Sequence, residues 1–244
     1  MSPMELPGKP VPVEAREFRQ LSDPERAALE ALISAYKAAE DHSERDRILD
    51  RIEDGFYGQE VLGLALLVFE NRDRFGVSQV NRVTTILAGN TSPQILPVLK
   101  VAYDRASDAE KARLLMAAAR VEGDGLPEFV ARGFEDNSSN VRFAAFDVVD
   151  HQDPRMKKVL LLAALRSSKS DVALAGLGEL EVDATPDSLP IIMEGLSSRN
   201  SEVREETRGT LQFLLDEEFR DSEAAAQWWQ QNRHRFDRNL IRAN

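Results

Sequence analysis

The chain has 244 residues, a formal net charge of −11 and no cysteine, which excludes disulfides, thiolate metal sites and cysteine nucleophiles. An acidic chain lacks the clustered Lys and Arg that follow a nucleic-acid backbone, so we expect no nucleic-acid partner. The first residues contain no apolar run of the signal-peptide type, and no stretch is apolar for the length of a membrane span. These features predict a cytoplasmic protein.

Residues 1–21 are expected to form a flexible leader, because prolines recur through the first part of it. Helical signals begin at Ser22, which has Pro24 in the first turn and Glu25 three positions later. This capping-box pattern predicts the start of a helix. Residues 22–90 then predict divergent helix pairs, including a largely apolar and therefore buried helix through residues 61–69.

The last helix of this N-terminal part is expected to begin at Ser78, which caps it, and to stop at Gly89. No part of the chain alternates polar and apolar residues for long enough to predict a strand. The predicted fold class is all-α, with short turns between successive helices.

Residues 91–220 contain an internal repeat with a period near 31 residues. Steps of that length relate three sets of apolar residues, namely Phe129, Phe134 and Val141, then Leu160, Leu165 and Val172, then Ile191, Leu196 and Val203. Small residues recur in the same register at Ala145, Gly176 and Thr207. Each unit predicts a first helix, a polar turn and a second helix that starts with a buried valine.

This order of a Leu-rich helix, a polar turn, a Val-Arg pair and an Ala-rich helix resembles the HEAT repeat, in the short form also found in phycobilisome-lyase-type proteins. The pair occurs as Val141-Arg142 and Val203-Arg204, whereas Ala173 replaces the arginine in the unit between them. The resemblance implies a right-handed α-α superhelix of about six helix pairs with a capping helix. It is specific for fold and not for function, since such superhelices serve many roles.

Residues 221–244 are expected to form that capping helix and a basic tail, with Asp221 or Ser222 as the helix cap. Trp228 and Trp229 lie within the helix. Because adjacent helical residues point about 100° apart, one tryptophan should be buried and the other partly exposed. The arginines that follow either pair with acidic faces of the array or form a short docking tail.

The candidate partner-binding surface lies on the second helices. With Val141 in the core, Phe143 and Phe146 point away from it, and the 31-residue step extends each into a row across neighbouring helices. The predicted partner-binding residues are Leu115, Phe143, Phe146, Leu174 and Leu177, flanked by Asp147, Asp150 and Glu181. We expect an amphipathic or basic helix of a protein partner to bind there. The alternative is that helix–helix packing buries both rows.

Arg142 and Arg204 follow the buried valines of their units. In HEAT-like arrays this arginine commonly bonds an acidic residue in the turn of its own or the next unit, and Asp136 is the nearest candidate. We therefore interpret these residues as a structural ladder that orients the stack.

The favoured function is a non-catalytic scaffold or adaptor. No paired metal ligands, phosphate-binding loop or nucleophile motif occurs, so no catalytic residue, metal or cofactor is predicted. The resemblance leaves two enzyme alternatives. A phycobilin-lyase-like enzyme or assembly factor would need a polar tetrapyrrole pocket, and a HEAT-like DNA glycosylase, the less favoured of the two, would need a basic groove.

Overall fold

The computed structural model describes residues 14–242, which form thirteen α-helices, two short 3-10 turns and no β-strand. The helices of the N-terminal part are α1 (Asp23–Ala38), α2 (His42–Gly55), α3 (Val61–Glu70), α4 (Arg72–Leu87), α5 (Ile95–Tyr103) and α6 (Asp108–Ala117). The others are α7 (Gly125–Phe134), α8 (Ser139–Asp150), α9 (Pro154–Leu165), α10 (Ser170–Val182), α11 (Leu189–Glu194), α12 (Ser201–Leu215) and α13 (Ser222–Asn232). The all-α prediction is confirmed.

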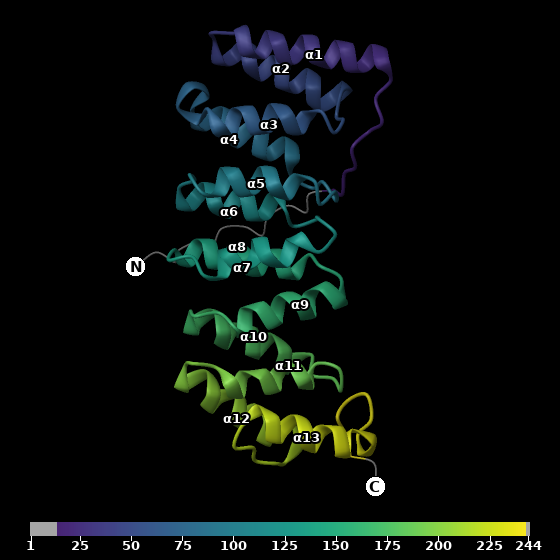
Figure 1. Cartoon of the computed structure of the whole chain (residues 1–244), viewed down its shortest axis with the longest axis vertical. Coiled ribbons are helices and arrows are strands. Elements are labelled where there is room, and N and C mark those ends of the chain that lie inside the picture. Colours follow the sequence, from purple (N-terminus) through teal and green to yellow (C-terminus); the bar gives the residue numbers. More distant parts are fainter. Residues whose placement is uncertain (1–13, 243–244) are drawn as a thin grey trace, which may run out of the picture.

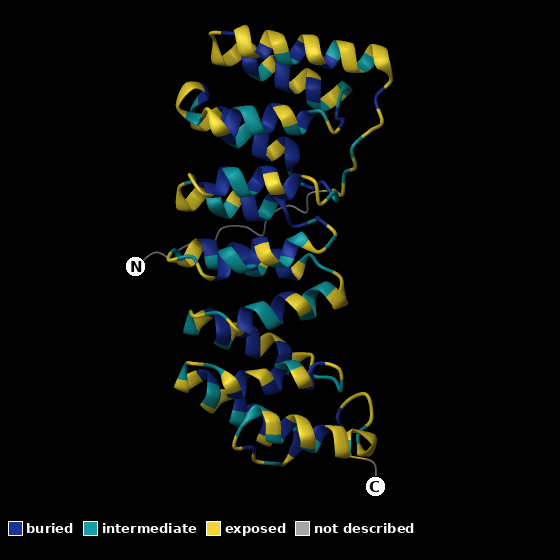
Figure 2. Cartoon of the chain, in the orientation of Figure 1, coloured by how far each residue is buried: buried dark blue, intermediate teal, exposed yellow. Residues whose placement is uncertain are grey.

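The helices are stacked in chain order along the long axis of the molecule (Figure 1). Each even-numbered helix up to α12 packs against the helix before it, and most of the remaining packing joins helices that are near neighbours in sequence. Buried side chains line the inside of every layer, whereas exposed ones lie on the outer surfaces and turns (Figure 2). The contacts therefore have a repeat-like arrangement.

The 31-residue register predicted from sequence reappears as one recurring contact between the two helices of a pair. A Cβ added to Gly133 would lie 3.0 Å from the Cβ of Ala145, and one added to Gly176 would lie 3.0 Å from the Cβ of Ala164. One added to Gly195 would meet the hydroxyl of Thr207. The three pairs occupy equivalent positions, so the small residues are needed because the two helices approach closely there.

Ser22 and Asp221 begin helices as the sequence predicts. Ser22 and Glu25 form the predicted capping box, and the side chain of Asp221 accepts a hydrogen bond from the Ala224 N–H. Asp153 caps α9 in the same way. Thr185 and Pro186 form a turn ahead of α11, which begins at Leu189, and the Ser188 hydroxyl binds the main chain of Thr185.

The fourth helix begins earlier than expected and is bent. It runs from Arg72, but Gly76 at φ 82° and ψ 162° is not helical, so two helical segments meet at a kink there and the second begins close to the predicted cap Ser78. A positive φ suits glycine because it has no Cβ. The predicted stop is confirmed, since Gly89 lies just beyond the helix end with φ 80°.

Residues 14–21 form an extended strap that runs along one edge of the array from α1 to the level of α5 (Figure 1). The Arg16 N–H donates to the Gly89 carbonyl (2.7 Å), and the Arg19 N–H donates to the Tyr57 carbonyl (2.9 Å). The Arg16 guanidinium lies 4.2 Å from the centre of the Tyr57 ring and pairs with Glu53. Composition did not predict these contacts for the expected leader, whose residues 1–13 lie outside the described part.

The C-terminal helix α13 packs against α11 at the end of the array. Trp229 is buried and Trp228 is half-buried, which confirms the expectation from their 100° separation. Both rings contact Phe236, and the Arg242 guanidinium lies 5.6 Å from the centre of that ring. The tail therefore folds back onto the capping helix, and Arg242 also pairs with Glu217.

Candidate partner-binding surface

The predicted apolar surface is partly open. Phe143 on α8 is 69% exposed, the third-highest value among the exposed large hydrophobic residues of the described chain. Phe146 is half-buried, and its ring packs 5.0 Å from that of Phe134. Leu174 on α10 is also half-buried. The row through Phe143 and Leu174 is therefore accessible to a partner.

The second predicted row is wrong at two of its three positions. Leu115 is fully buried and Leu177 is 1% exposed, so neither can contact a partner. Leu115 packs where α6 meets the next pair, since its side chain fills the space above Gly133. Contact with a neighbouring helix, which the 31-residue pattern does not reveal, places these two leucines in the core.

Two of the three flanking acids lie in the open. Asp147 and Asp150 are exposed, and Glu181 is half-buried and accepts a hydrogen bond from the Thr210 hydroxyl at 3.0 Å. Desolvation raises the pKa of the Asp147 carboxyl, and the nearby Asp150 charge adds to the rise. Asp147 has no ion pair with any described residue. It is therefore a carboxylate that a bound cation would stabilise.

The structure adds residues of α10 and α12 that the sequence prediction did not include. Val182 is 83% exposed and Phe213 is 79% exposed, and 31 residues separate them. Gly178 and Gly209 hold the position that Asp147 has on α8, and a Cβ added to either would meet no atom within 4 Å. The 31-residue step from His151 leads to Val182 and Phe213 and would have found both.

Acidic side chains dominate this face. The cations on it and beside it already have partners, since Arg204 binds two main-chain carbonyls and the other three pair with acids. Arg142 pairs with Asp171 at 2.5 Å, Lys157 with Glu179 at 3.3 Å, and Arg208 with Glu205 at 2.9 Å. The exposed acids of the three second helices are Asp147, Asp150, Asp171, Glu179, Glu202, Glu205 and Glu206. The face therefore combines exposed apolar side chains with an excess of negative charge.

We call this region the acidic-apolar face. It consists of the exposed sides of α8, α10 and α12. α10 and α12 pack directly against each other, with a hydrogen bond from Thr210 to Glu181, and the long Arg142 side chain links α8 to Asp171 of α10. A cavity of about 520 Å³ lies at its α12 end and is lined by Glu205, Arg208, Gly209, Gln212, Glu218, Phe219 and Arg220.

The predicted ladder exists with different partners. One Arg142 nitrogen donates to the main-chain carbonyls of Asp136 and Asn137, and Arg204 makes the same two bonds to Ser198 and Arg199. The ion pair of Arg142 goes to Asp171 in the next pair and not to the Asp136 carboxylate.

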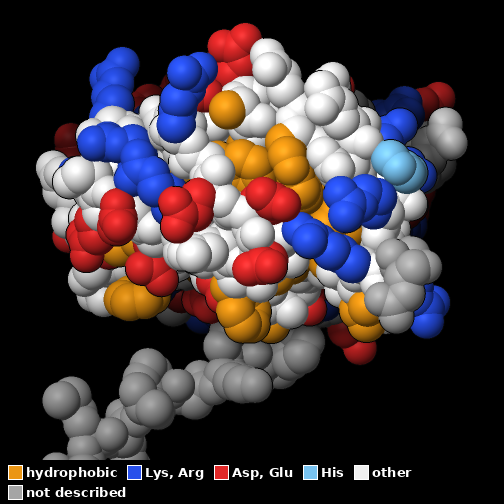
Figure 3. All heavy atoms as spheres, turned by 90° about the horizontal axis from the view of Figure 1, so that it is seen from below, with side chains coloured by type: hydrophobic (Ala, Val, Ile, Leu, Met, Phe, Trp, Pro, Cys, Tyr) orange, Lys and Arg blue, Asp and Glu red, His pale blue; other side chains and the backbone are white. Residues whose placement is uncertain are grey.

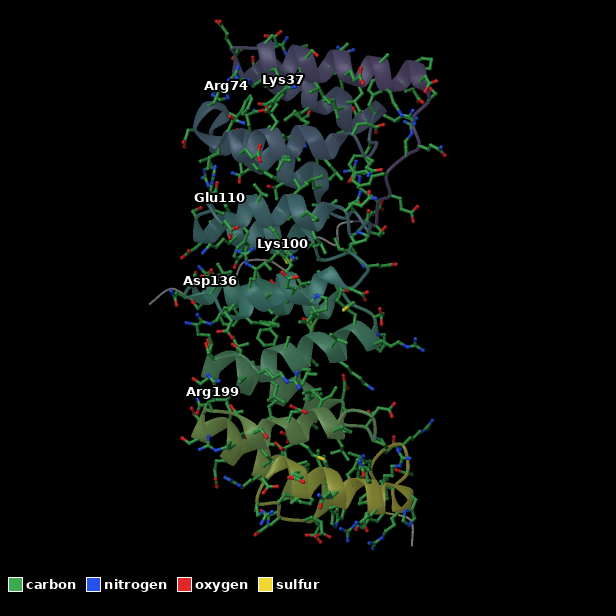
Figure 4. The ribbon with its side chains drawn as sticks, in the orientation of Figure 1. Lys37, Arg74, Lys100, Glu110, Asp136 and Arg199 are labelled. Atoms are coloured by element: carbon green, nitrogen blue, oxygen red, sulfur yellow. The ribbon has the colours of Figure 1, made fainter. Side chains whose placement is uncertain are left out.

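Asp136 pairs instead with Lys111 at 2.7 Å, because its side chain turns toward the preceding helix pair. It also accepts from the Tyr103 hydroxyl at 3.3 Å and from the Ser138 N–H at 2.9 Å. Burial alone would raise the pKa of Asp136, but these bonds outweigh it and lower the pKa. Glu110, Asp136 and Arg199 lie along one edge of the array, where each pair turns from its first helix to its second (Figure 4).

No cluster of three or more His, Asp or Glu residues suited to a metal ion occurs among residues 14–242. Within the same range no helix combines the length and the apolar composition that crossing a membrane requires. The C-terminal end of the array shows hydrophobic side chains near its centre with acidic and basic side chains around them (Figure 3). That end is mixed in charge, in contrast to the acidic-apolar face.

Comparisons with family models, with curated proteins and with solved structures found no match to this chain.

Proposed function

We propose that this protein is a non-catalytic scaffold built as a right-handed HEAT-like superhelix, and that it holds a protein partner on the acidic-apolar face. In a superhelix of this kind the second helices line the concave side, which offers a long surface to a partner. The equivalent contacts Gly133–Ala145, Ala164–Gly176 and Gly195–Thr207 support the regular stacking that this proposal needs.

The exposure of Phe143 carries the functional part of the proposal. A phenylalanine that is 69% exposed on a helix gains little from burial in the isolated chain. Phe213 is equally open on the same face, and large exposed aromatic residues are enriched where proteins bind one another. Three exposed acids of the face, Asp147, Glu202 and Glu206, have no ion pair with a described residue, which favours a partner with positive charge.

A quantitative native affinity purification tests the proposal. The bait is the full chain, compared with the double variant Phe143→Ser and Phe213→Ser. We expect a stoichiometric protein to be recovered with the wild type and lost with the double variant, because removal of two central aromatic contacts weakens binding by about 100-fold or more.

Val77→Ser is the matched control. Val77 is 52% exposed on α4, outside the acidic-apolar face, so its loss changes surface hydrophobicity without touching the proposed site. The control bait should recover the same protein as the wild type. Recovery that does not depend on Phe143 and Phe213 would contradict the proposal.

A further inference from the structure

The acidic-apolar face has a shape as well as a composition. Its apolar side chains stand at two places, Phe143 on α8 and the pair Val182 and Phe213 on α10 and α12. Between them the surface is low, because Gly178 and Gly209 carry no side chain. The cavity beside Gly209 continues this low strip toward the end of α12.

No contact within the chain requires glycine at positions 178 and 209. Glycine inside a helix costs about 0.5–1 kcal/mol relative to alanine. Gly133, Gly176 and Gly195 offset that cost by close helix contacts, but no atom lies near the Cβ positions of Gly178 and Gly209. The space above the latter two is open solvent in the isolated chain.

Charge identifies what fits this space. Asp147, Glu202 and Glu206 are exposed and have no ion pair with any described residue. The nearby cations Arg142, Lys157 and Arg208 are each occupied by another acid of the face. A binding partner therefore has to supply positive charge near these acids and apolar side chains near Phe143 and Phe213.

Resting on the function proposed above, we propose that the partner segment is a single basic amphipathic helix that crosses α8, α10 and α12. Its apolar side lies between Phe143 and Phe213, its backbone approaches the array over Gly178 and Gly209, and its Lys and Arg side chains pair with Asp147 and Glu206. A helix of about 15–20 residues is about 22–30 Å long, which is the length we expect for a segment that reaches across three helices.

Two synthetic helical peptides test the inference against the full chain by fluorescence anisotropy. One carries Leu on one side and Lys on the other, and the second has Glu in place of every Lys. We expect the Lys peptide to bind, with an affinity that falls as salt is raised, and the Glu peptide not to bind. Equal binding of both peptides would overturn the inference.

The variant Gly178→Leu with Gly209→Leu separates a fitted site from general attraction to an acidic protein, because it leaves every charge in place. We expect at least about tenfold weaker binding of the Lys peptide, a loss of about 1.4 kcal/mol. The same variant should raise Tm by a few degrees, since leucine favours a helix over glycine. A raised Tm shows that lost binding does not come from unfolding.

Gly63→Leu is the matched control, because Gly63 lies on α3 with no atom near its Cβ position and outside the face. It should raise Tm and leave the peptide affinity unchanged. Wild-type affinity in the double glycine variant would overturn the inference. If neither peptide binds while a captured protein still depends on Phe143 and Phe213, the basic-helix inference fails and the scaffold function stands.

Discussion

The second helices of the N-terminal and C-terminal halves have the same place in the stack but opposite surfaces. On α2 and α4 the exposed side chains are polar apart from Val77, and Arg82 binds both Asp50 and Glu53. On α8, α10 and α12 the acids outnumber the cations, and Phe143 and Phe213 stand exposed among them.

The same stacking of helices therefore carries two kinds of exposed surface. The buried positions of each pair follow the repeat, because every layer must pack against the next. The outward positions are free of that constraint, so they differ between the halves. We propose that a partner binds the half in which large aromatic side chains are exposed beside acids without an ion pair.

The largest expected effect contrasts a core leucine with an exposed aromatic of the same predicted surface. Leu115→Ala should reduce the free energy of unfolding by about 2–5 kcal/mol, because it leaves a cavity above Gly133. Phe143→Ala should change it by less than about 0.5 kcal/mol, since the ring is mostly in solvent. Urea denaturation of both variants measures the difference, and similar losses would contradict the assignment of the two rows.

A second prediction contrasts two acids, one from each half. Glu110 is buried, pairs with Arg72 at 3.0 Å and accepts bonds from the Ser107 hydroxyl (2.6 Å) and N–H (2.7 Å). Burial alone would raise the pKa of Glu110, but these bonds outweigh it and lower the pKa. Its ionised form therefore stabilises the fold above the unfolded-state pKa, and this stability is lost as the pH falls through the lowered value.

We expect Glu110→Gln to cost about 1–3 kcal/mol at neutral pH and less in acid. The ionised form of Asp147 has the opposite effect on stability. Its pKa is raised in the folded state, so its ionisation disfavours that state. Asp147→Asn should therefore be neutral or slightly stabilising at neutral pH. Thermal melts of both variants at two pH values measure this, and a destabilised Asp147→Asn variant would show an unrecognised partner for that carboxylate.

A third, smaller effect concerns the ladder. Arg142→Ala removes an ion pair with Asp171 and two bonds to main-chain carbonyls, whereas Arg204→Ala removes only the corresponding carbonyl bonds. We expect the free energy of unfolding to fall by about 1–2 kcal/mol in Arg142→Ala and by about half of that in Arg204→Ala. Denaturation at low and high salt measures the ionic contribution to the free energy of unfolding, and this contribution should appear only for Arg142. Equal salt dependence of the two variants would argue against the Asp171 pair.

The smallest effect is expected at the strap. Arg16→Ala removes the Glu53 pair and the contact with the Tyr57 ring but keeps the backbone bonds. The free energy of unfolding should fall by about 0.5–1 kcal/mol, and hydrogen exchange should be faster at the amides of residue 16 and Thr91. Unchanged exchange at both amides would show that the backbone bonds alone hold the strap.

Several features could be predicted from sequence because they are local or periodic. Ser22 with Glu25, Asp221 and Gly89 mark helix ends through short-range chemistry, and the 31-residue step places Val141 and its equivalents in the core. The separation of Trp228 from Trp229 follows from helix geometry alone.

Other features depend on contacts between residues distant in sequence. The burial of Leu115 and Leu177 depends on how closely neighbouring helices approach, and the partner of Arg142 depends on where the Asp136 side chain turns. The contacts of Arg16 with Tyr57 and Gly89 join an extended segment to two later turns, which no local pattern encodes.

The sequence by itself determined that the chain is all-α, where a few of its helices begin or end, and which positions repeat, because capping and hydrophobic periodicity act within a few turns. Only the tertiary structure decided which outward residues stay open, because exposure depends on the neighbours of each helix. It removed Leu115 and Leu177 from the candidate surface, kept Phe143 on it, and added Gly178, Gly209 and Phe213.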